Sequence, residues 1–318
     1  MRYQKQELLS YIGNKQEFLQ KKVVAIVGLG AIGSNTANLL ARAGINLILI
    51  DRDIVELENL QRQTLYDEKD IGKPKSIQAK KKLKLINSEI KIEAFVEDLN
   101  YKNIDELINS DLILDCSDNM ETRFLINDYS IKNDIPWIYA AVLGVNAMSM
   151  NIVPQKTPCF RCIFKESNAI TENCDSVGVL NTITNLIATI QVNESLKILT
   201  NQEFNKSLVL FNIWNLSMQK FKINKNIHCE ACSNLNFEYL DGKNTKQLIK
   251  LCGTNSFQIH GNPIDLENLY ERLSKFSDAK INEYCVYSTS LTAFSDGRVL
   301  IRAENLNQAK SLYSRFIS

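Results

Sequence analysis

Short apolar runs alternate with longer, more polar segments along the first half of the chain. The runs predict buried strands and lie at 22–27, 45–50, 91–96, 111–116 and 136–142. The segments between them predict helices, of which the clearest are 34–43, 75–86 and 121–132. Such alternation is typical of βαβ units, so we expect an α/β fold with a Rossmann-like sheet flanked by helices.

The pattern changes near the middle of the chain. Residues 147–153 alternate between apolar and polar side chains, and 207–213 and 217–223 predict two further strands. We expect antiparallel strands at one edge, which makes the sheet mixed. Residues 180–199 predict a long helix, and 4–20 predict a polar amphipathic helix. The apolar positions of that N-terminal helix are Leu8, Leu9, Ile12 and Phe18.

A second, smaller domain is expected after a composition shift at 241–243. We place the boundary so that residues 1–242 form one domain and 243–318 form a small α+β domain. Its predicted strands are 257–260, 283–288, 291–294 and 298–303, and its predicted helices are 265–276 and 305–316. Asp296-Gly297 lies between two of these strands, which is a hairpin signal.

Composition and charge restrict the class of protein. The 318 residues include 37 Lys and Arg against 36 Asp and Glu, so the net charge is +1, and 45% are hydrophobic. These values are typical of a globular protein and exclude a disordered chain. The balanced charge argues against a dedicated nucleic-acid binder. No apolar segment reaches the ~20 residues of a membrane span, and no signal peptide is recognisable, so we expect a cytoplasmic protein.

A glycine-rich loop, Gly28-x-Gly30-x-x-Gly33, lies between the first predicted strand and helix. Gly28 permits a tight turn, Gly30 lets a phosphate approach the backbone, and Gly33 lets the helix pack on the strand. The helix N-terminus would donate N–H groups to phosphates, and Asp51 could accept hydrogen bonds from ribose hydroxyls. A purely structural turn is the alternative, and the motif does not distinguish NAD from ATP.

Two CxxC pairs, Cys159–Cys162 and Cys229–Cys232, stand far apart in the sequence. Together they supply four thiolates for a closed tetrahedral zinc site, which leaves no open position for catalysis. Free redox pairs or disulfides are the alternative, and a reducing compartment disfavours disulfides. We therefore expect a structural zinc knuckle that ties the end of the large sheet to the segment after its last strands.

Further polar residues follow the second strand and open the next helix. Asp53, Asn59, Arg62 and Gln63 lie on the carboxyl side of the expected sheet, where open α/β folds bind ligands. Arg62 could brace phosphate oxygens through its fork of donors, although the spacing alone favours a solvated loop. Lys75, at the start of a helix, could also reach a phosphate.

The predicted strand 111–116 contains Asp115 and is followed by Asp118 and Asn119. Asp118 could hold Mg²⁺ on bound phosphates, and the alternative is that it caps the following helix. Asp115 fits a buried structural acid. Cys174 lies in a polar segment and could be an exposed nucleophile or an incidental free thiol.

In this order, these blocks closely resemble the MoeB/ThiF/HesA family of ubiquitin-activating-enzyme-like adenylyltransferases. The resemblance covers about residues 2–240. It is carried by Arg2-Tyr-Gln-Lys-Gln6, Gly28–Gly33, Asp51-Arg-Asp53, Asn59-Leu-Gln-Arg-Gln63, Lys75, Asp115-Cys-Ser-Asp-Asn119 with Arg123 and Asn127, and the two CxxC pairs. The C-terminal segment looks like the extension of MoeB/ThiF-type proteins of low-GC Gram-positive bacteria.

The resemblance implies ATP-dependent adenylation of the C-terminal glycine carboxylate of a ubiquitin-like sulfur carrier, ThiS or MoaD, in thiamin or molybdopterin biosynthesis. Carried over by motif, the residues that hold ATP are Gly30, Asp51, Asn59, Arg62 and Lys75, and Asp118 holds Mg²⁺. We expect the same nucleotide site to include Gly28, Gly33, Asp53, Gln63 and Asn119.

The resemblance also implies a homodimer in which a basic residue near the N-terminus reaches the partner's site. The family's motif there is usually Arg-Tyr-x-Arg-Gln, and Lys5 replaces its second arginine. Lysine keeps the charge and loses the bidentate fork. Cys174 matches the position at which some members carry a cysteine that can bond the carrier.

Other functions stay open on the sequence alone. The same chemistry could adenylate a short peptide, as in microcin-C-type enzymes. The glycine loop would permit an NAD-dependent oxidoreductase, although no catalytic His or Tyr constellation accompanies it in the sequence. A non-catalytic binding protein that keeps the fold is the last alternative, and Lys5 is the only feature that favours it.

Overall fold

The computed structural model describes residues 2–165, 177–242, 248–251 and 256–317. The first two ranges form a large compact unit, and the last two form a smaller one. Each unit has hydrophobic core residues of its own. Within the described ranges, no helix is long and apolar enough to cross a lipid bilayer.

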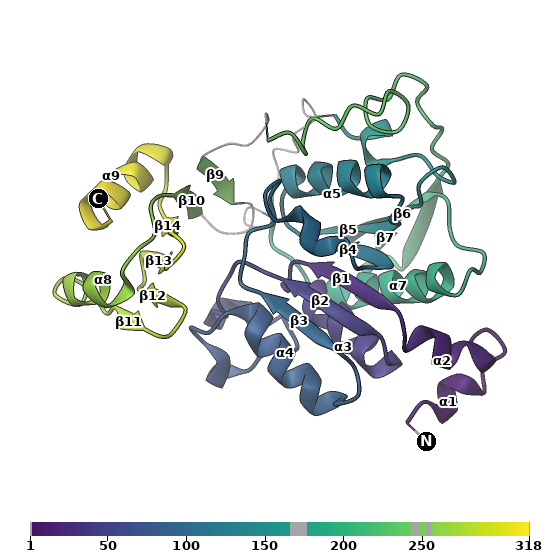
Figure 1. The fold of residues 1–318 in the computed structure, drawn as a ribbon, viewed down its shortest axis with the longest axis horizontal. Helices are drawn as coiled ribbons and strands as arrows, with labels where there is room; N and C mark the ends of the chain where they lie inside the picture. The colour runs from purple at the N-terminus through teal and green to yellow at the C-terminus, as the bar shows by residue number, and fades with distance from the viewer. Residues whose placement is uncertain (1, 166–176, 243–247, 252–255, 318) are drawn as a thin grey trace. The chain divides into compact units, whose positions relative to one another are not determined.

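The described part of the large unit contains one mixed eight-stranded sheet, in the order β3-β2-β1-β4-β5-β6-β7-β8. The strands are β1 (Val23–Val27), β2 (Asn46–Ile50), β3 (Ile92–Phe95), β4 (Leu112–Asp115), β5 (Trp137–Leu143), β6 (Asn146–Ile152), β7 (Leu208–Asn212) and β8 (Ser217–Phe221). Strands β1 to β5 pair in parallel, and β6, β7 and β8 pair antiparallel. The predicted parallel sheet with antiparallel strands at one edge is confirmed (Figure 1).

Helices cover both faces of this sheet (Figure 1). One face carries α3 (Gly33–Ala43), α4 (Lys75–Ile86) and α7 (Asn181–Leu199), and the other carries α5 (Met120–Asn133). Short 3-10 helices lie in the connections: η2 (Leu57–Asn59), η3 (Glu68–Asp70), η4 (Ile104–Leu107) and η5 (Phe160–Cys162). In β1, Ile26 packs into the first layer and Val27 into the second. β1 is an uninterrupted apolar run in the sequence because both of its faces are buried.

The N-terminal segment differs from the single helix predicted over 4–20. It forms α1 (Gln4–Glu7), the 3-10 helix η1 (Gly13–Lys15) and α2 (Gln16–Leu19). Gly13 has a φ of 43°, a left-handed conformation that a right-handed helix cannot contain. Of the predicted apolar positions, Ile12 is buried, whereas Leu8, Leu9 and Phe18 are exposed. The prediction of one amphipathic helix is therefore wrong.

The smaller unit combines an antiparallel sheet with two helices, so the predicted α+β class is confirmed. Its described strands lie in the order β11-β12-β13-β14-β10-β9. They are β9 (Leu248–Leu251), β10 (Ser256–His260), β11 (Lys280–Ile281), β12 (Cys285–Tyr287), β13 (Leu291–Phe294) and β14 (Arg298–Arg302), with helices α8 (Leu266–Leu273) and α9 (Leu306–Phe316). The Asp296-Gly297 hairpin is present, with Gly297 at a φ of 91°. The sequence analysis predicts neither β9 nor β11, and β11, with two residues, is too short to show a period.

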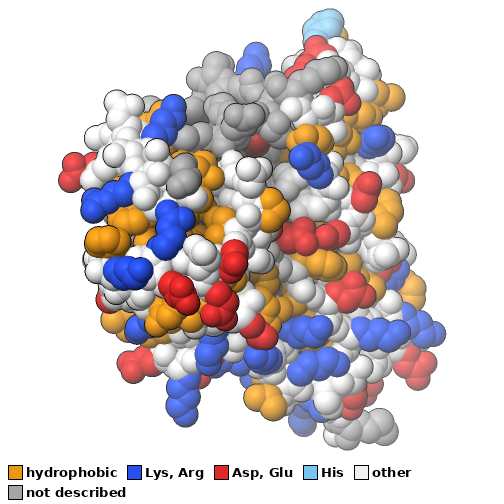
Figure 2. Space-filling view, turned by 60° about the vertical axis from the view of Figure 1, so that its left-hand side comes forward, with side chains coloured by type: hydrophobic (Ala, Val, Ile, Leu, Met, Phe, Trp, Pro, Cys, Tyr) orange, Lys and Arg blue, Asp and Glu red, His pale blue; other side chains and the backbone are white. Residues whose placement is uncertain are grey.

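The surface carries charges of both signs. On the face drawn in Figure 2, lysine and arginine side chains are interspersed with aspartates and glutamates. Lys82 of α4, for example, forms ion pairs with Asp67 at 2.6 Å and with Asp70 at 2.8 Å, both at η3. Paired surface charges of this kind are compatible with the net charge of +1.

Candidate active site and metal centre

Several predicted ligand-binding residues lie at the edge formed by the carboxyl ends of the parallel strands. β1 runs into the glycine loop, β2 is followed by Asp51, and β4 is followed by Asp118. β1 and β4 are neighbours in the sheet although they are not consecutive in the chain. Open α/β sheets bind ligands where the strand order reverses in this way. We call this group the polar edge, and it consists of Asp51, Arg52, Asp53, Lys75, Asp98 and Asp118.

The three glycines of the loop have different surroundings. Gly28 has a φ of 90°, and a Cβ there would lie 2.6 Å from the carbonyl oxygen of Cys116. A Cβ at Gly33 would overlap the carbonyl oxygen of Gly28. These two positions require glycine for packing. At Gly30 the only atom within 4 Å of a Cβ, among the described residues, is Nε2 of Gln63 at 3.8 Å, so the backbone there is open to a ligand.

Asp51 braces the glycine loop. Its Oδ2 accepts a hydrogen bond from the Leu29 N–H at 2.5 Å, and its Oδ1 accepts one from the Asp53 N–H at 2.7 Å. Burial raises the pKa of the Asp51 carboxyl, and the nearby Lys75 ammonium opposes that shift. Each carboxylate oxygen keeps a second lone pair, so Asp51 can still accept from a ribose hydroxyl.

Lys75 places a buried cation at the polar edge. Its side chain is 8% exposed, and its Nζ lies 3.4 Å from Oδ2 of Asp53. Burial alone would lower the pKa of Lys75, but the carboxylates of Asp53 and Asp51 outweigh burial and raise it. The ammonium therefore stays charged at neutral pH. The hydroxyl of Tyr66 donates to the carbonyl of Leu29 at 3.0 Å and so links this region to the glycine loop.

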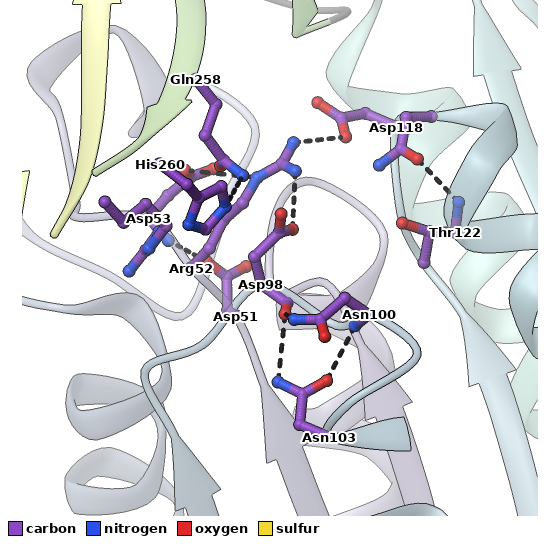
Figure 3. A network of polar contacts seen from close by, with 12 residues as sticks. Asp51, Arg52, Asp53, Asp98, Asn100, Asn103, Asp118, Thr122, Gln258 and His260 are labelled. Atoms are coloured by element: carbon purple, nitrogen blue, oxygen red, sulfur yellow. Dashed lines mark hydrogen bonds and ion pairs between the residues drawn. The ribbon is translucent and has the colours of Figure 1, made fainter. Parts of the chain in front are cut away.

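Asp118 and Asn119 have separate roles at the start of α5. Asn119 caps the helix, because its side chain accepts a hydrogen bond from the Thr122 N–H at 2.8 Å. The alternative that Asp118 is the cap is therefore wrong. Asp118 instead turns its Oδ1 towards Nη2 of Arg52 at 3.2 Å (Figure 3). Its side chain is 49% exposed, so the carboxylate remains accessible to a ligand.

Asp115 is the structural acid that the sequence predicts. It is fully buried, and its Oδ2 lies 3.0 Å from Nε of Arg123. Burial raises the pKa of Asp115, and the Arg123 guanidinium opposes the shift. Arg123 also donates to the carbonyl of Ser117 at 2.7 Å, which supports the loop that carries Asp118.

The residues of the Asn59–Gln63 block point in different directions. The Oδ1 of Asn59 accepts from the Glu56 N–H at 3.2 Å, so this side chain caps η2. Arg62 is half-buried and donates to the carbonyl of Glu58 at 3.0 Å. Gln63 is 3% exposed, and its Oε1 has no hydrogen-bond partner among the described residues. A buried amide oxygen next to Gly30 is an acceptor that a ligand or water would satisfy.

Lys5 is a predicted site residue that lies away from the polar edge of its own chain. Lys5 lies in α1. The hydroxyl of nearby Tyr3 accepts a hydrogen bond from Nδ2 of Asn87 at 2.8 Å, and Asn87 lies shortly before the amino end of β3. Within one chain, Lys5 therefore lies at the opposite edge of the sheet. Cys174 falls outside the described residues.

The sequence interpretation missed three polar residues that shape the site. Arg52 and Asp98 form an ion pair at 2.8 Å, and only the Asp51-Arg-Asp53 triplet in the sequence hinted at a role for Arg52. Gln191 of α7 is fully buried and donates to the carbonyl of Asp115 at 3.0 Å. Its signal in the sequence is a glutamine at a position that the helix buries, which the apolar pattern alone does not explain.

The four cysteines form one compact cluster. Their Sγ atoms all lie within 4.8 Å of one another. The Cys159–Cys229 and Cys162–Cys232 sulfurs are 3.5 Å apart, and those of Cys159 and Cys162 are 3.9 Å apart. Four thiolates around one zinc ion have sulfurs about 3.8 Å apart, given a Zn–S bond of about 2.3 Å. The cluster can therefore hold one tetrahedral metal ion.

Polar and aromatic contacts anchor the cluster to α5. The Phe160 N–H, between the first two cysteines, donates to Oδ1 of Asn127 at 2.8 Å. Arg161 pairs with the buried carboxylate of Asp128 at 3.2 Å. After the second CxxC pair, the ring of Tyr239 stacks on Phe124 with centroids 5.0 Å apart. The cluster thus joins the segment after β6 to the segment after β8, as the sequence predicts.

The chain is similar to several known proteins. The ThiF family matches residues 3–232 of the chain. The sulfur carrier protein ThiS adenylyltransferase of Bacillus subtilis is 35% identical over 99% of this chain and 99% of that protein. The protein of the same name from Escherichia coli is 35% identical and covers 64% of this chain and 82% of its own length. The crystal structure of Escherichia coli MccB with ATP is 25% identical, with a TM-score of 0.65 over 74% of this chain and 75% of that one. The resemblance in the sequence is confirmed, and the chain belongs to the ThiF family.

Proposed function

We propose that this chain is an adenylyltransferase that uses ATP to activate the C-terminal glycine carboxylate of a ubiquitin-like sulfur carrier. The observation that carries the proposal is the polar edge, which lies beside a glycine loop open at Gly30. The relatives from Bacillus subtilis and Escherichia coli are named as adenylyltransferases of the carrier ThiS. The first of them spans the whole chain, which favours ThiS and thiamin biosynthesis over MoaD and molybdopterin biosynthesis.

The reaction joins two anions. A carboxylate oxygen of the carrier attacks the α-phosphorus of ATP, the bond to the bridging oxygen breaks, and pyrophosphate leaves. The site must screen the repulsion between the reactants and stabilise the charge that develops on the α-phosphate. The buried ammonium of Lys75 and the half-buried guanidinium of Arg62 supply positive charge for this purpose. No general base is needed, because a carboxylate is already ionised at neutral pH.

Asp118 is the residue that we assign to Mg²⁺. A carboxylate is the hard oxygen donor that this ion prefers, and the side chain is half exposed at the carboxyl end of β4. Bound to the phosphates, Mg²⁺ would neutralise part of the charge that leaves with pyrophosphate.

The nucleotide itself would lie over the glycine loop. The open backbone at Gly30 and the unsatisfied Oε1 of Gln63 both fit such a ligand. Asp51 would accept from the ribose with its remaining lone pairs, while Gly28 and Gly33 shape the loop. The full set that we assign to the nucleotide site is Gly28, Gly30, Gly33, Asp51, Asp53, Asn59, Gln63 and Asn119.

We assign a structural Zn²⁺ to the cysteine cluster. Four sulfurs at tetrahedral spacing complete the coordination of the ion, so no position is left for a substrate. Cysteines that bind metal as thiolates suit a reducing compartment, which supports a cytoplasmic enzyme.

Three further assignments rest on the family. Residues 1–242 would carry the adenylation activity, and 243–318 would form an accessory domain. Lys5 lies far from the polar edge of its own chain, so it can act on phosphates only in a homodimer, at the partner's site. Cys174 would bond the carrier in the later sulfur-transfer step.

The experiment that tests the function is ATP–pyrophosphate exchange, with purified carriers of the ThiS type and the MoaD type added separately. We expect exchange with one carrier, and with the ThiS type in preference. A carrier without its terminal Gly-Gly serves as the matched control and should support none. Exchange with a short peptide instead would favour the microcin-C-type alternative. ATP binding without exchange for any substrate would contradict the proposal and indicate a non-catalytic binding protein.

A further inference from the structure

Arg52 joins carboxylates that follow three different strands. Its Nη1 lies 2.8 Å from Oδ1 of Asp98, its Nη2 lies 3.2 Å from Oδ1 of Asp118, and its Nε lies 3.8 Å from Oδ1 of Asp53. Asp53 follows β2, Asp98 follows β3, and Asp118 follows β4. The guanidinium therefore bridges the carboxyl ends of β3 and β4, which are separated in the sheet by β2 and β1 (Figure 3).

The Asp98 end of this bridge is firmly held. The carbonyl of Asp98 accepts hydrogen bonds from Nδ2 of Asn100 at 2.8 Å and from Nδ2 of Asn103 at 3.1 Å. Asn103 Oδ1 in turn accepts from the Asn100 N–H at 2.8 Å (Figure 3). The Asp98 side chain is 12% exposed and that of Arg52 is 9% exposed. The connection from Asn103 to Arg52 is thus a continuous set of hydrogen bonds and an ion pair, with its most buried part at Asp98 and Arg52.

The Asp118 end is the accessible one. Its side chain is 49% exposed, against 9% for Arg52, so the carboxylate meets the buried guanidinium on one side and remains accessible on the other. An arginine fork is planar and permanently charged, so it fixes the orientation of a carboxylate better than a flexible lysine would. The contact of Oδ1 with Arg52 restricts the rotation of the carboxylate, and with it the position of the second oxygen of Asp118.

We propose that Arg52 and Asp98 are positioning residues, which hold the carboxylate of Asp118 in the orientation that binds the divalent metal ion of the nucleotide. The inference rests on the function proposed above, because it takes Asp118 as the metal ligand. Neither Arg52 nor Asp98 needs to touch the metal or the substrate. Supporting residues of this kind typically change metal affinity 10–100-fold when they are removed.

A purely structural role for the bridge predicts something different. Removing one partner of a largely buried ion pair destabilises a fold, because it leaves the other charge without compensation. A structural role would change the melting temperature and leave the metal affinity of the folded protein unchanged. The two roles are therefore separated by measuring metal affinity and melting temperature on the same samples.

The experiment measures Mn²⁺ binding to the full chain by electron paramagnetic resonance, in the presence of saturating α,β-methylene-ATP. We expect Arg52→Gln to raise the Kd for Mn²⁺ about tenfold and Asp98→Asn to raise it about threefold, with Arg52→Lys between them. Affinity for the nucleotide analogue in EDTA should stay within about twofold of wild type. Arg42→Gln, an exposed arginine on α3, is the matched control and should leave Mn²⁺ binding unchanged.

Several outcomes would overturn the inference. An unchanged Kd for Mn²⁺ in folded Arg52→Gln, or an equal rise in Arg42→Gln, excludes positioning by Arg52. A loss in Asp98→Asn larger than in Arg52→Gln would make Asp98 itself a metal ligand. If Arg52→Gln does not fold, Asp98→Asn decides the question, because it retains an acceptor for the guanidinium. Wild-type protein that binds Mn²⁺ but exchanges pyrophosphate with no substrate would overturn the proposed function alone.

Discussion

The cysteine cluster and the polar edge lie in the same unit and are both assembled from distant segments, but they differ in their surroundings. Cys159 is fully buried and Cys229 is 2% exposed, beside aromatic rings that pack on one another. At the polar edge, four carboxylates surround two cations, and Asp118 is half exposed. The cysteine cluster is built of one residue type around a closed centre, whereas the polar edge is partly exposed and contains both acidic and basic side chains.

We expect the cysteine cluster to contribute mainly to stability and the polar edge mainly to turnover. A closed site of four thiolates can only bind an ion and hold segments together, so its loss should lower stability. An open site with excess negative charge is poorly suited to stabilise the fold, because like charges repel. A divalent cation would offset this excess negative charge and would also bind the phosphates of ATP, as an adenylating enzyme requires. Substitutions in the two regions should therefore have different main effects.

The largest effect is expected in the cysteine cluster. Cys159→Ser should abolish metal binding and lower the melting temperature by roughly 10 °C, because structural zinc contributes several kcal/mol to folding. Metal content by mass spectrometry and thermal melting measure the two effects. Cys285→Ser, at a buried cysteine of the smaller unit, should keep the metal. A Cys159→Ser protein that loses metal and melts with wild type would show that the cluster does not stabilise the fold.

At the polar edge, the expected effect is on rate. Asp118→Asn should lower ATP–pyrophosphate exchange about 100-fold, which corresponds to about 2.7 kcal/mol of transition-state stabilisation. The melting temperature should change by no more than about 2 °C, because the ion pair of Asp118 is half exposed. The control is Asp134→Asn, at the left-handed end of α5, where asparagine is equally acceptable. A large fall in melting temperature for Asp118→Asn would show that Asp118 also stabilises the fold, and would contradict the difference proposed between the two regions.

The glycine loop tests the same distinction within one motif. Gly30→Ala should fold normally and raise the KM for ATP about tenfold, because a methyl group would occupy the space that a phosphate needs. Gly33→Ala should instead yield little folded protein, because its Cβ would overlap the Gly28 carbonyl oxygen. Nucleotide affinity by calorimetry and thermal melting separate these outcomes. Normal ATP binding by Gly30→Ala would remove Gly30 from the nucleotide site.

A smaller change is expected from Lys5→Arg. The substitution restores the fork found in the family's N-terminal motif, so exchange activity should be retained or should rise up to about threefold. The rise should depend on dimer formation, since Lys5 lies far from the polar edge of its own chain. Exchange rates should be compared above and below the dimer dissociation constant found by ultracentrifugation. A large loss of kcat in Lys5→Arg would contradict the assignment.

The smallest expected effect is on the pH dependence of stability, through Glu106 in η4. Burial and the neighbouring Glu97 raise the pKa of Glu106 to about 7. The folded state then binds a proton that the unfolded state releases near pH 4.5, so the contribution of Glu106 to stability falls as pH rises from about 4.5 to about 7. Glu106→Gln mimics the protonated form and should melt roughly 1–3 °C above wild type at pH 8, with no difference at pH 4. A difference that is the same at both pH values would exclude this cause.

The sequence by itself determined most elements of the large sheet and the chemical types of the two sites. Apolar runs buried on both faces mark the parallel strands, and the glycine loop follows the first of them. Both signals are local, because each is contained in a few consecutive residues of the chain. The two CxxC pairs are equally local, since each pair is a chelating unit before the chain folds.

Only the tertiary structure decided which polar side chains meet. Arg52 contacts Asp98 and Asp118, which are 46 and 66 positions away in the chain. The structure also decided that Asn119, and not Asp118, caps α5, and that the N-terminal helical segment is broken at Gly13. Periodicity does not contain this information, because charged residues in loops show no pattern. Their contacts depend on strand order in the sheet, which places the ends of β3 and β4 within reach of one guanidinium.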